Sequence, residues 1–385
     1  MTPRDAPGAP GVPYAPGTPD APGPVGPLEL VWEDRFEGPA GTLPDPAHWC
    51  PDLLAPGAKN GELQRYTADP RNIALDGEGR LVLTARREAD GGFTSGCVYS
   101  ARRFHARYGR IEARVKVPAG QGLWPAFWMM GEGFLQGTHW PHNGEIDIME
   151  ILGHRPDELH NTLHGPGYSG ADSLHSVYRA SADGAPTDLS QGFHTYGVDW
   201  APGEIRWWLD APENVTGTRT AAELTGELGV PWIFDQPCFL ILNLAVGGDW
   251  PGAPDEATAF PAQMLVDHVR IQQGRDGHLA RAGALAADSG ATHREGAGLE
   301  IAVSPQMRHG DAGTVTVHAD EPEGRDGAGV LLLVDAAPYE AELVEGRAEL
   351  SLPPLPPGTH ELRAVLSDPA LALSAREAVI SVDVR

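Results

Sequence analysis

The stretch that organises this chain is residues 143–152, which read NGEIDIMEIL. Three carboxylates, Glu145, Asp147 and Glu150, stand here among Ile, Met and Leu, where burial is costly unless the acids are paired or have shifted pKa values. A helix would place Glu145 and Glu150 about 140° apart. A strand places Glu145 and Asp147 on one face, and a β-bulge, which adds one residue, returns Glu150 to that face. The stretch therefore predicts a bulged strand with three acids in a row.

Two carboxyl groups on one face suit the hydrolysis of glycosidic bonds. Retaining glycosidases use two carboxyl groups about 5–5.5 Å apart, one as nucleophile and one as acid/base. Alternate strand positions are about 6.6 Å apart, so the two side chains must converge, as a concave sheet allows. A solvated acidic face on an edge strand remains the alternative interpretation of these ten residues.

Residues 145–150, EIDIME, resemble the signature of glycoside hydrolase family 16. The extra residue before the last Glu is typical of the laminarinase-like members, which are endo-β-1,3-glucanases. The resemblance implies that Glu145 is the nucleophile, that Asp147 assists and that Glu150 is the acid/base. It implies a retaining endo-glycosidase that hydrolyses laminarin-type β-1,3-glucan by double displacement, with no cofactor for catalysis. The alternatives are a mixed-linkage β-1,3-1,4-glucanase or a galactanase of the same family, or a glucan-binding protein without catalysis.

The rest of the chain is predicted to be all-β. Short alternating segments at 28–32, 72–75, 80–85 and 109–117 are separated by Gly and Asp turns, and 193–210 reads as a hairpin. Many short strands at close spacing indicate a sandwich or barrel. The family resemblance implies a concanavalin-like β-jelly roll of two curved antiparallel sheets with a cleft on the concave side.

Three tryptophans are considered for sugar stacking, since aromatic faces pack against the apolar faces of pyranose rings. Residues 122–130, GLWPAFWMM, resemble a family strand whose first Trp borders the cleft. We expect Trp124 at the cleft and Trp128 in the core. Trp140, just ahead of the acids, is the stronger cleft candidate.

Five further residues are substrate-binding candidates because their segments resemble the family's cleft segments. His164 opens a Gly-rich loop after the next strand, and Asn243 is a lone amide in the apolar run 237–246. Trp250 follows in another Gly-rich loop. Asn60 and Arg102 are the weaker candidates, from segments 60–67 and 99–102. A buried Asn243 needs hydrogen-bond partners, which a cleft would provide.

The resemblance also implies a structural Ca²⁺ on the convex side, held by the carboxylate of Asp267 and by backbone carbonyls, since hard cations prefer oxygen ligands. The remaining interpretation of Asp267 is a surface carboxylate. The cysteines Cys50, Cys97 and Cys238 are far apart and show no metal-ligand spacing. We expect three buried thiols rather than one disulfide.

Charge restricts the partners. The net charge is −25, which disfavours nucleic acid and anionic membranes and fits a neutral polysaccharide such as β-glucan. No run reaches the length of a membrane-spanning helix, so we expect no membrane insertion, and we expect a monomer. The N-terminus has no apolar signal-peptide core. We expect an extracellular or cell-surface protein, with a cytoplasmic one as the alternative.

Composition divides the chain into four parts. Residues 1–27, rich in Ala, Pro and Gly, are expected to form a disordered leader. The catalytic domain spans 28–274, and a linker spans 275–297, with a short helical turn around 279–285. Apolar alternation at even spacing over 298–385 is typical of an immunoglobulin-like sandwich. That module has no Trp or Phe, so we interpret it as a spacer or adhesion module, with carbohydrate binding as the alternative.

Overall fold

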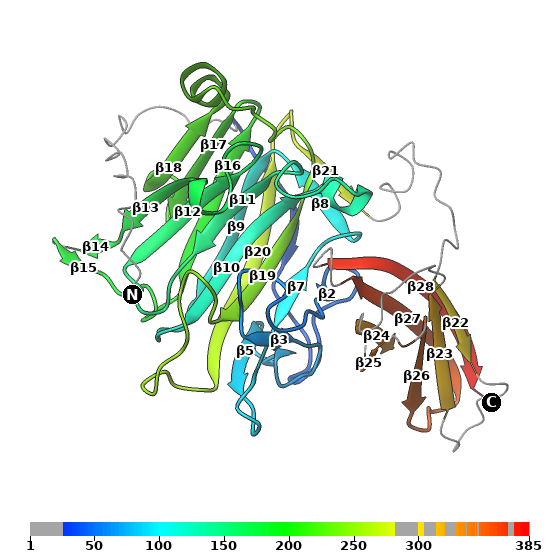
Figure 1. Ribbon diagram of the computed structural model, residues 1–385. Coiled ribbons are helices and arrows are strands. Elements are labelled where there is room, and N and C mark those ends of the chain that lie inside the picture. The colour runs from blue at the N-terminus through cyan, green and yellow to red at the C-terminus, as the bar shows by residue number, and fades with distance from the viewer. Residues whose placement is uncertain are drawn as a thin grey trace, which may run out of the picture.

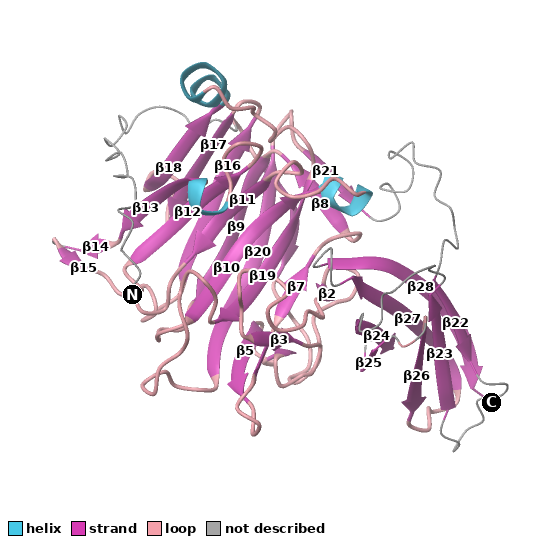
Figure 2. Ribbon diagram, in the orientation of Figure 1, coloured by secondary structure: helices cyan, strands magenta, loops and turns pink. Residues whose placement is uncertain are grey.

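The computed structural model describes residues 26–182, 184–281, 299–303, 313–319, 329–335, 337–342, 344, 346–368 and 373–384. Residues 1–25 of the predicted leader and residues 282–297 of the predicted linker lie outside the described residues. Strands dominate the described part (Figure 2). The short helical segments are η1 (Glu132–Gln136), η2 (Gly170–Asp172) and η3 (Glu223–Leu228).

Two large sheets form the main body of the molecule (Figure 1). The first sheet has the spatial order β18 (Val215–Thr220), β17 (Glu204–Leu209), β16 (His194–Ala201), β9 (Gly109–Lys116), β20 (Ala262–Gln273), β5 (Leu81–Arg87), β6 (Phe93–Ser95) and β3 (Gln64–Tyr66). On its margins, β1 (Glu29–Asp34) pairs with β20 and β4 (Ile73–Leu75) pairs with β5. All these pairings are antiparallel except that of β3 with β6.

The second sheet carries the acidic stretch. Its spatial order is β13 (Leu174–Arg179), β12 (Glu158–His164), β11 (Glu145–Glu150), β10 (Leu123–Gly131), β19 (Cys238–Val246), β7 (Cys97–Tyr99) and β2 (Cys50–Pro51). β8 (Phe104–Arg107) pairs with β19, and the short β14 (Ser181–Ala182) and β15 (Ala185–Pro186) form a separate ribbon. The predicted hairpin at 193–210 is confirmed as β16 and β17.

The core lies between the two sheets and takes side chains from both. Tyr196 and Trp200 of the first sheet and Phe127 and Met149 of the second are fully buried in one apolar cluster. Strand side chains alternate between faces, so each of these strands gives one face to the core and leaves the other free for a site. Cys50, Cys97 and Cys238 are buried and form no disulfide, as the sequence predicted.

The region after residue 274 differs from expectation at one point. Residues 278–281 form a strand, β21 (His278–Arg281), which pairs with β8 in the second sheet. The predicted helical turn around 279–285 is therefore wrong for its described part. Pairing with an open strand edge satisfies the backbone groups of 278–281, a tertiary contact that local sequence does not encode.

The C-terminal residues form two further sheets. One has the order β22 (Leu299–Val303), β23 (Gly313–Ala319) and β26 (Arg347–Leu352); the other has β25 (Ala337–Glu342), β24 (Gly329–Val334), β27 (Gly358–Asp368) and β28 (Leu373–Val384). They enclose a small apolar core of their own. In the described part of the chain, no helix has the length and apolarity that crossing a bilayer requires.

Candidate active site

A cavity of about 840 Å³ opens on the face of the second sheet that points away from the core. Strands β10, β11, β12 and β19 supply its floor, and loops around residues 52–62, 170–175 and 249–250 supply its walls. Nine of the residues predicted from the sequence line it: Asn60, Trp124, Trp140, Glu145, Asp147, Glu150, His164, Asn243 and Trp250. A volume of this size is typical of small-molecule and sugar sites.

A β-bulge in β11 brings the three carboxylates to this one face. Against β10, Phe127 pairs with Met149 and Trp128 pairs with Asp147, so Ile148 is the additional residue. The register against β12 shifts at the same place. Ile148 and Met149 both enter the core, and Glu150 returns to the side of Asp147. The bulge predicted from the sequence is confirmed.

The two glutamates have different hydrogen-bond donors. Trp140 Nε1 donates to Glu145 Oε2 at 2.6 Å. Trp124 Nε1 donates to Glu150 Oε1 at 3.1 Å, and Thr162 Oγ1 donates to Glu150 Oε2 at 3.3 Å. Each carboxylate is thus held at a fixed place on the cavity floor. Glu145 is half-buried, whereas Glu150 is buried.

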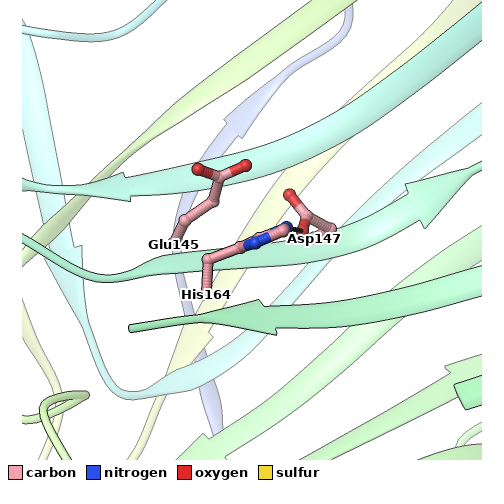
Figure 3. A group of neighbouring side chains, drawn as sticks. All are labelled: Glu145, Asp147 and His164. Atoms are coloured by element: carbon pink, nitrogen blue, oxygen red, sulfur yellow. Dashed lines mark ion pairs between the residues drawn. The ribbon is translucent and has the colours of Figure 1, made fainter. Parts of the chain in front are cut away.

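His164 stands beside Asp147 on the neighbouring strand (Figure 3). Its Nε2 lies 3.2 Å from Asp147 Oδ2. The backbone N–H of Gly170 donates to His164 Nδ1, so in the neutral ring the proton sits on Nε2 and faces Asp147. Donor atoms of Glu145, Asp147 and His164 lie within 4.8 Å of one another, which among the described residues is the group that could hold a metal ion.

Burial and mutual repulsion raise two of the three acidic pKa values. The pKa of Glu150 is raised well above its ordinary value, first by burial and then by the nearby charge of Asp147. The pKa of Asp147 is also raised well above its ordinary value, by burial and by Glu145. The hydrogen bond from Trp124 opposes the rise at Glu150. A carboxyl that keeps its proton near neutral pH can act as a general acid.

Aromatic rings form the walls around the acids. Trp124 and Trp250 meet edge to face with 5.2 Å between ring centroids, and His160 meets Trp250 in the same way at 4.8 Å. Trp140 and Trp250 are 42% and 43% exposed, high values for Trp. Their exposure within a concave site suits stacking on a sugar ring, which is both apolar on its face and polar at its rim.

Trp128 was expected in the core, and this prediction is wrong. The residue lines the cavity and its Nε1 donates to Asn243 Oδ1 at 2.7 Å. Alternation along β10 is unbroken, since Trp124, Ala126, Trp128 and Met130 all line the cavity. Counting by twos from Trp124 would therefore have placed Trp128 at the cleft; the expectation followed instead from the usual burial of bulky aromatics. Asn243 in turn donates from Nδ2 to the Tyr66 hydroxyl at 3.0 Å. The lone amide of the apolar run therefore has both partners that its burial requires.

Arg102 is the predicted site residue that does not line the cavity. It sits at a turn with φ of +62°, and its backbone N–H donates to His105 Nε2. The neighbouring Tyr99 pairs with Ile241 on β19, so the segment does belong to the second sheet. The turn after β7 places Arg102 away from the cavity, which the spacing from Tyr99 did not reveal.

His160 and Lys59 are among the cavity residues that sequence reasoning missed. His160 lies on β12 two and four positions before Thr162 and His164, so strand alternation could have found it. Its Nε2 is buried with no hydrogen-bond partner among the described residues, and burial lowers its pKa to about 4. Lys59 Nζ lies 5.2 Å from the ring centroid of Trp128. No local sequence pattern marks Lys59, because a loop brings it there.

Asp267, the predicted calcium ligand, lies on β20 in the other sheet. Its Oδ2 is 2.8 Å from His268 Nδ1 and 3.5 Å from Arg114 Nη1. A Ca²⁺ at this carboxylate would have to compete with the Arg114 guanidinium. The donor set seen here is thus an ion pair rather than a set of oxygens, and calcium binding stays a prediction.

Known proteins resemble the part of the chain that forms the two large sheets and the cavity. The model of the family "Glycosyl hydrolases family 16" matches residues 61–267. A β-glucanase of Rhodothermus marinus is 40% identical over 252 residues, covering 63% of this chain and 84% of the relative. A glucan endo-1,3-β-glucosidase of Cryptopygus antarcticus is 38% identical over 256 residues, covering 63% and 90%.

A solved structure of another glucanase has a similar fold. The catalytic domain of an endo-1,3-β-glucanase (laminarinase) from Thermotoga petrophila matches with a TM-score of 0.58 and 38% identity. The match covers 65% of this chain and 99% of that chain. The predicted jelly roll is thereby confirmed for the two large sheets. The family model ends at residue 267, ahead of the C-terminal strands β22 to β28.

Proposed function

The chain belongs to glycosyl hydrolases family 16, and from this premise we propose that it is an endo-acting, retaining hydrolase of laminarin-type β-1,3-glucan. One observation carries the proposal: a bulged strand holds Glu145, Asp147 and Glu150 on one face of a cavity with aromatic walls. The different surroundings of the two glutamates support different roles for them.

The proposed reaction is a double displacement. A Glu145 oxygen attacks the anomeric carbon while the glycosidic C–O bond breaks, and the Glu150 proton goes to the leaving oxygen. The Glu150 carboxylate then takes a proton from water. The water oxygen attacks the same carbon and frees Glu145. Overall, one water molecule is consumed and one glycosidic bond is broken, which leaves a new reducing end and a new free hydroxyl group. The raised pKa of Glu150 supports its first role, as the acid.

Asp147 and His164 are proposed to assist this pair. Asp147 lies between the two glutamates on the strand and repels charge on both. A proton on Asp147 or on His164 Nε2 relieves that repulsion when Glu150 loses its own proton. Trp124, Trp140 and Trp250 are proposed as sugar-stacking walls, and Asn60 and Asn243 as polar contacts to the sugar.

A neutral glucan suits the charge of the site. The cavity contains the three catalytic acids together with Asp52, Glu62 and Asp249. An anionic polysaccharide would be repelled by these groups and by a net charge of −25. Hydroxyl groups of a neutral sugar can instead donate to them.

The test is product release from laminarin, with lichenan and agarose alongside. Early appearance of short oligosaccharides from laminarin, with retained anomeric configuration by NMR, is the expected result. Faster release from lichenan or agarose would favour the mixed-linkage or galactanase alternative. Binding of laminarin without release from any substrate would contradict the proposal and favour a binding protein.

Four further assignments belong to this proposal. The C-terminal strands are proposed to form an immunoglobulin-like module, supported by their two packed sheets. An extracellular or cell-surface location is proposed because the polymer substrate cannot enter a cell. A monomeric state is proposed as well, and size-exclusion chromatography with light scattering tests it. A structural Ca²⁺ at Asp267 is proposed from the family resemblance alone. Loss of several degrees of Tm on chelation would support it, and an unchanged Tm would remove it.

A further inference from the structure

The strand β24 in the C-terminal region is buried on both of its faces. Val330, Leu332 and Val334 belong to the small core of the C-terminal sheets. Leu331 and Leu333 point the other way and are 1% and 3% exposed, in the same apolar cluster as the core of the catalytic sheets. An antiparallel sheet with a free outer face would alternate apolar and polar residues. The apolar outer face of β24 therefore has a partner.

The two strands next to β24 supply the rest of this contact. Val365 of β27 pairs with Leu331 and is 3% exposed in the same shared cluster. Glu340 of β25 pairs with Leu331 from the other side, and its Oε1 accepts the backbone N–H of Ala68. Ala68 is fully buried and belongs to the catalytic part of the chain. Figure 1 shows the C-terminal strands beside the end of the molecule that carries β2 and β3.

We propose that the β24–β25–β27 face is a docking surface for the catalytic domain of the same chain, and that the docked module braces one end of the substrate cavity. Two independent observations carry the docking: an apolar face buried across from the module's own core, and a polar contact at its margin. A spacer held only by a flexible linker would show neither. The consequence for the cavity rests on the proposed function.

The contact at Ala68 lies two residues after β3, which leads to the cavity. Tyr66, the last residue of β3, accepts a hydrogen bond from Asn243 on its hydroxyl. Asn243 accepts from Trp128, and both Asn243 and Trp128 line the cavity. The backbone N–H of Tyr66 also donates to the Leu54 carbonyl. Fixing residues 66–68 thus fixes the aromatic and amide groups at this end of the cavity.

The Tyr66 network does not include the hydrogen-bond donors of the proton-transfer group. Glu150 has its donors in Trp124 and Thr162, neither of which belongs to the Tyr66 network. Loss of docking should therefore loosen the binding of a sugar ring near Trp128 more than it slows the chemical step. In kinetic terms, KM for long β-1,3-glucan should rise while kcat changes little.

The first experiment measures docking without reference to activity. Hydrogen exchange at the Ala68 amide is followed by mass spectrometry in the full chain and in the full chain with Leu331→Lys. Leu331 faces away from the module's own core, so the sheets can keep that core. Val344→Lys, at a residue 61% exposed in the same module, is the matched control. Docking predicts exchange about tenfold or more faster in Leu331→Lys only.

Equal exchange at Ala68 in all three proteins would overturn the docking. If Leu331→Lys fails to fold, Glu340→Ala, which removes only the acceptor of the Ala68 N–H, replaces it. Small-angle scattering of the unaltered chain gives a second readout. One compact particle is expected, and a profile of two bodies with variable separation would contradict docking.

The second experiment tests the brace on the docking-deficient variant. KM for laminarin is expected to rise about threefold or more, with kcat within about twofold of the unaltered chain. An unchanged KM despite lost docking would overturn the brace and leave the docking itself intact. Absence of turnover in the unaltered chain would instead contradict the proposed function, while the exchange and scattering results would still decide the docking.

Discussion

Glu145 and Glu150 are the same residue type on one strand, yet their surroundings prepare them for different chemistry. Glu145 is half-buried beneath the Trp140 indole. Glu150 is buried beside Asp147, and its pKa is raised well above the ordinary value. Environment rather than residue type therefore separates a nucleophile from an acid at this scale.

Removing either charge should stop most turnover. Glu145→Gln and Glu150→Gln keep side-chain size but remove the nucleophile and the transferable proton, so kcat should fall by about 10²–10⁴-fold in each. Hydrolysis of laminarin is the measurement. Glu78→Gln, at an exposed carboxylate outside the cavity, is the control and should keep its rate. Turnover at the unaltered rate in both cavity variants would contradict the assignment.

Azide should tell the two roles apart. In Glu145→Ala, azide replaces the nucleophile in a single displacement, so an α-glycosyl azide is expected from an activated β-glucoside. In Glu150→Ala, azide replaces water in the second step and should give the β-glycosyl azide. The reverse outcome would mean that the two roles are exchanged. NMR of the products gives the anomeric configuration.

Trp124 should set the alkaline limit of activity. Its indole N–H donates to Glu150 and lowers the pKa of that carboxyl against the larger effect of burial. Trp124→Phe removes the donor, so the pKa of Glu150 should rise further. Because activity on the alkaline side ends when Glu150 loses its proton, that limb of the kcat/KM profile should move to higher pH.

The control for this shift is Trp140→Phe. Trp140 donates to Glu145 rather than to Glu150, so its loss should leave the alkaline limb in place even if KM rises. A limb that moves to lower pH in Trp124→Phe, or that moves equally in both variants, would show that the Trp124 hydrogen bond does not control Glu150.

At the scale of elements, the site depends on how closely β10 approaches the loop that enters β11. A Cβ added to Gly131 at the end of β10 would lie 1.7 Å from the Asn143 carbonyl oxygen. Gly131→Ala should push away the segment that carries Trp140 and leads to Glu145. We expect a loss of about 1–3 kcal/mol in the free energy of unfolding, together with lower activity.

Gly192→Ala is the matched control for that substitution. A Cβ at Gly192 meets nothing within 4 Å, and its φ is not in the left-handed region. Its Tm should therefore stay close to that of the unaltered chain. Denaturant unfolding measures both variants. Equal stability of the two would mean that the loop before β11 adapts without cost.

At the scale of the whole molecule, charge should select among glucans. With a net charge of −25, the chain should repel carboxymethylated β-1,3-glucan, and salt should screen that repulsion. Between about 10 and 300 mM NaCl, kcat/KM for the anionic glucan should rise about twofold or more. Laminarin, being neutral, is the control. The same salt response for both polymers would show that repulsion of the charged substrate does not cause the change in kcat/KM.

Much of the site could be read from the sequence because it lies on few strands. EIDIME predicted the bulge and the common face of three acids, since both follow from alternation and the cost of burying charge. Strand alternation also placed β9 close to its observed bounds, and the family resemblance did the same for β10. Trp128 was misplaced because its bulk was given more weight than the alternation along β10, which puts it on the same face as Trp124.

The sequence by itself determined the all-β class and the acidic row, because side-chain alternation and the cost of buried charge act over a few neighbouring residues. Only the tertiary structure decided what faces that row. Lys59, His160 and the Trp250 wall come from separate elements. The double burial of β24 likewise arises from contact with strands far away in the chain. Such contacts depend on which surfaces meet, and local sequence does not encode that meeting.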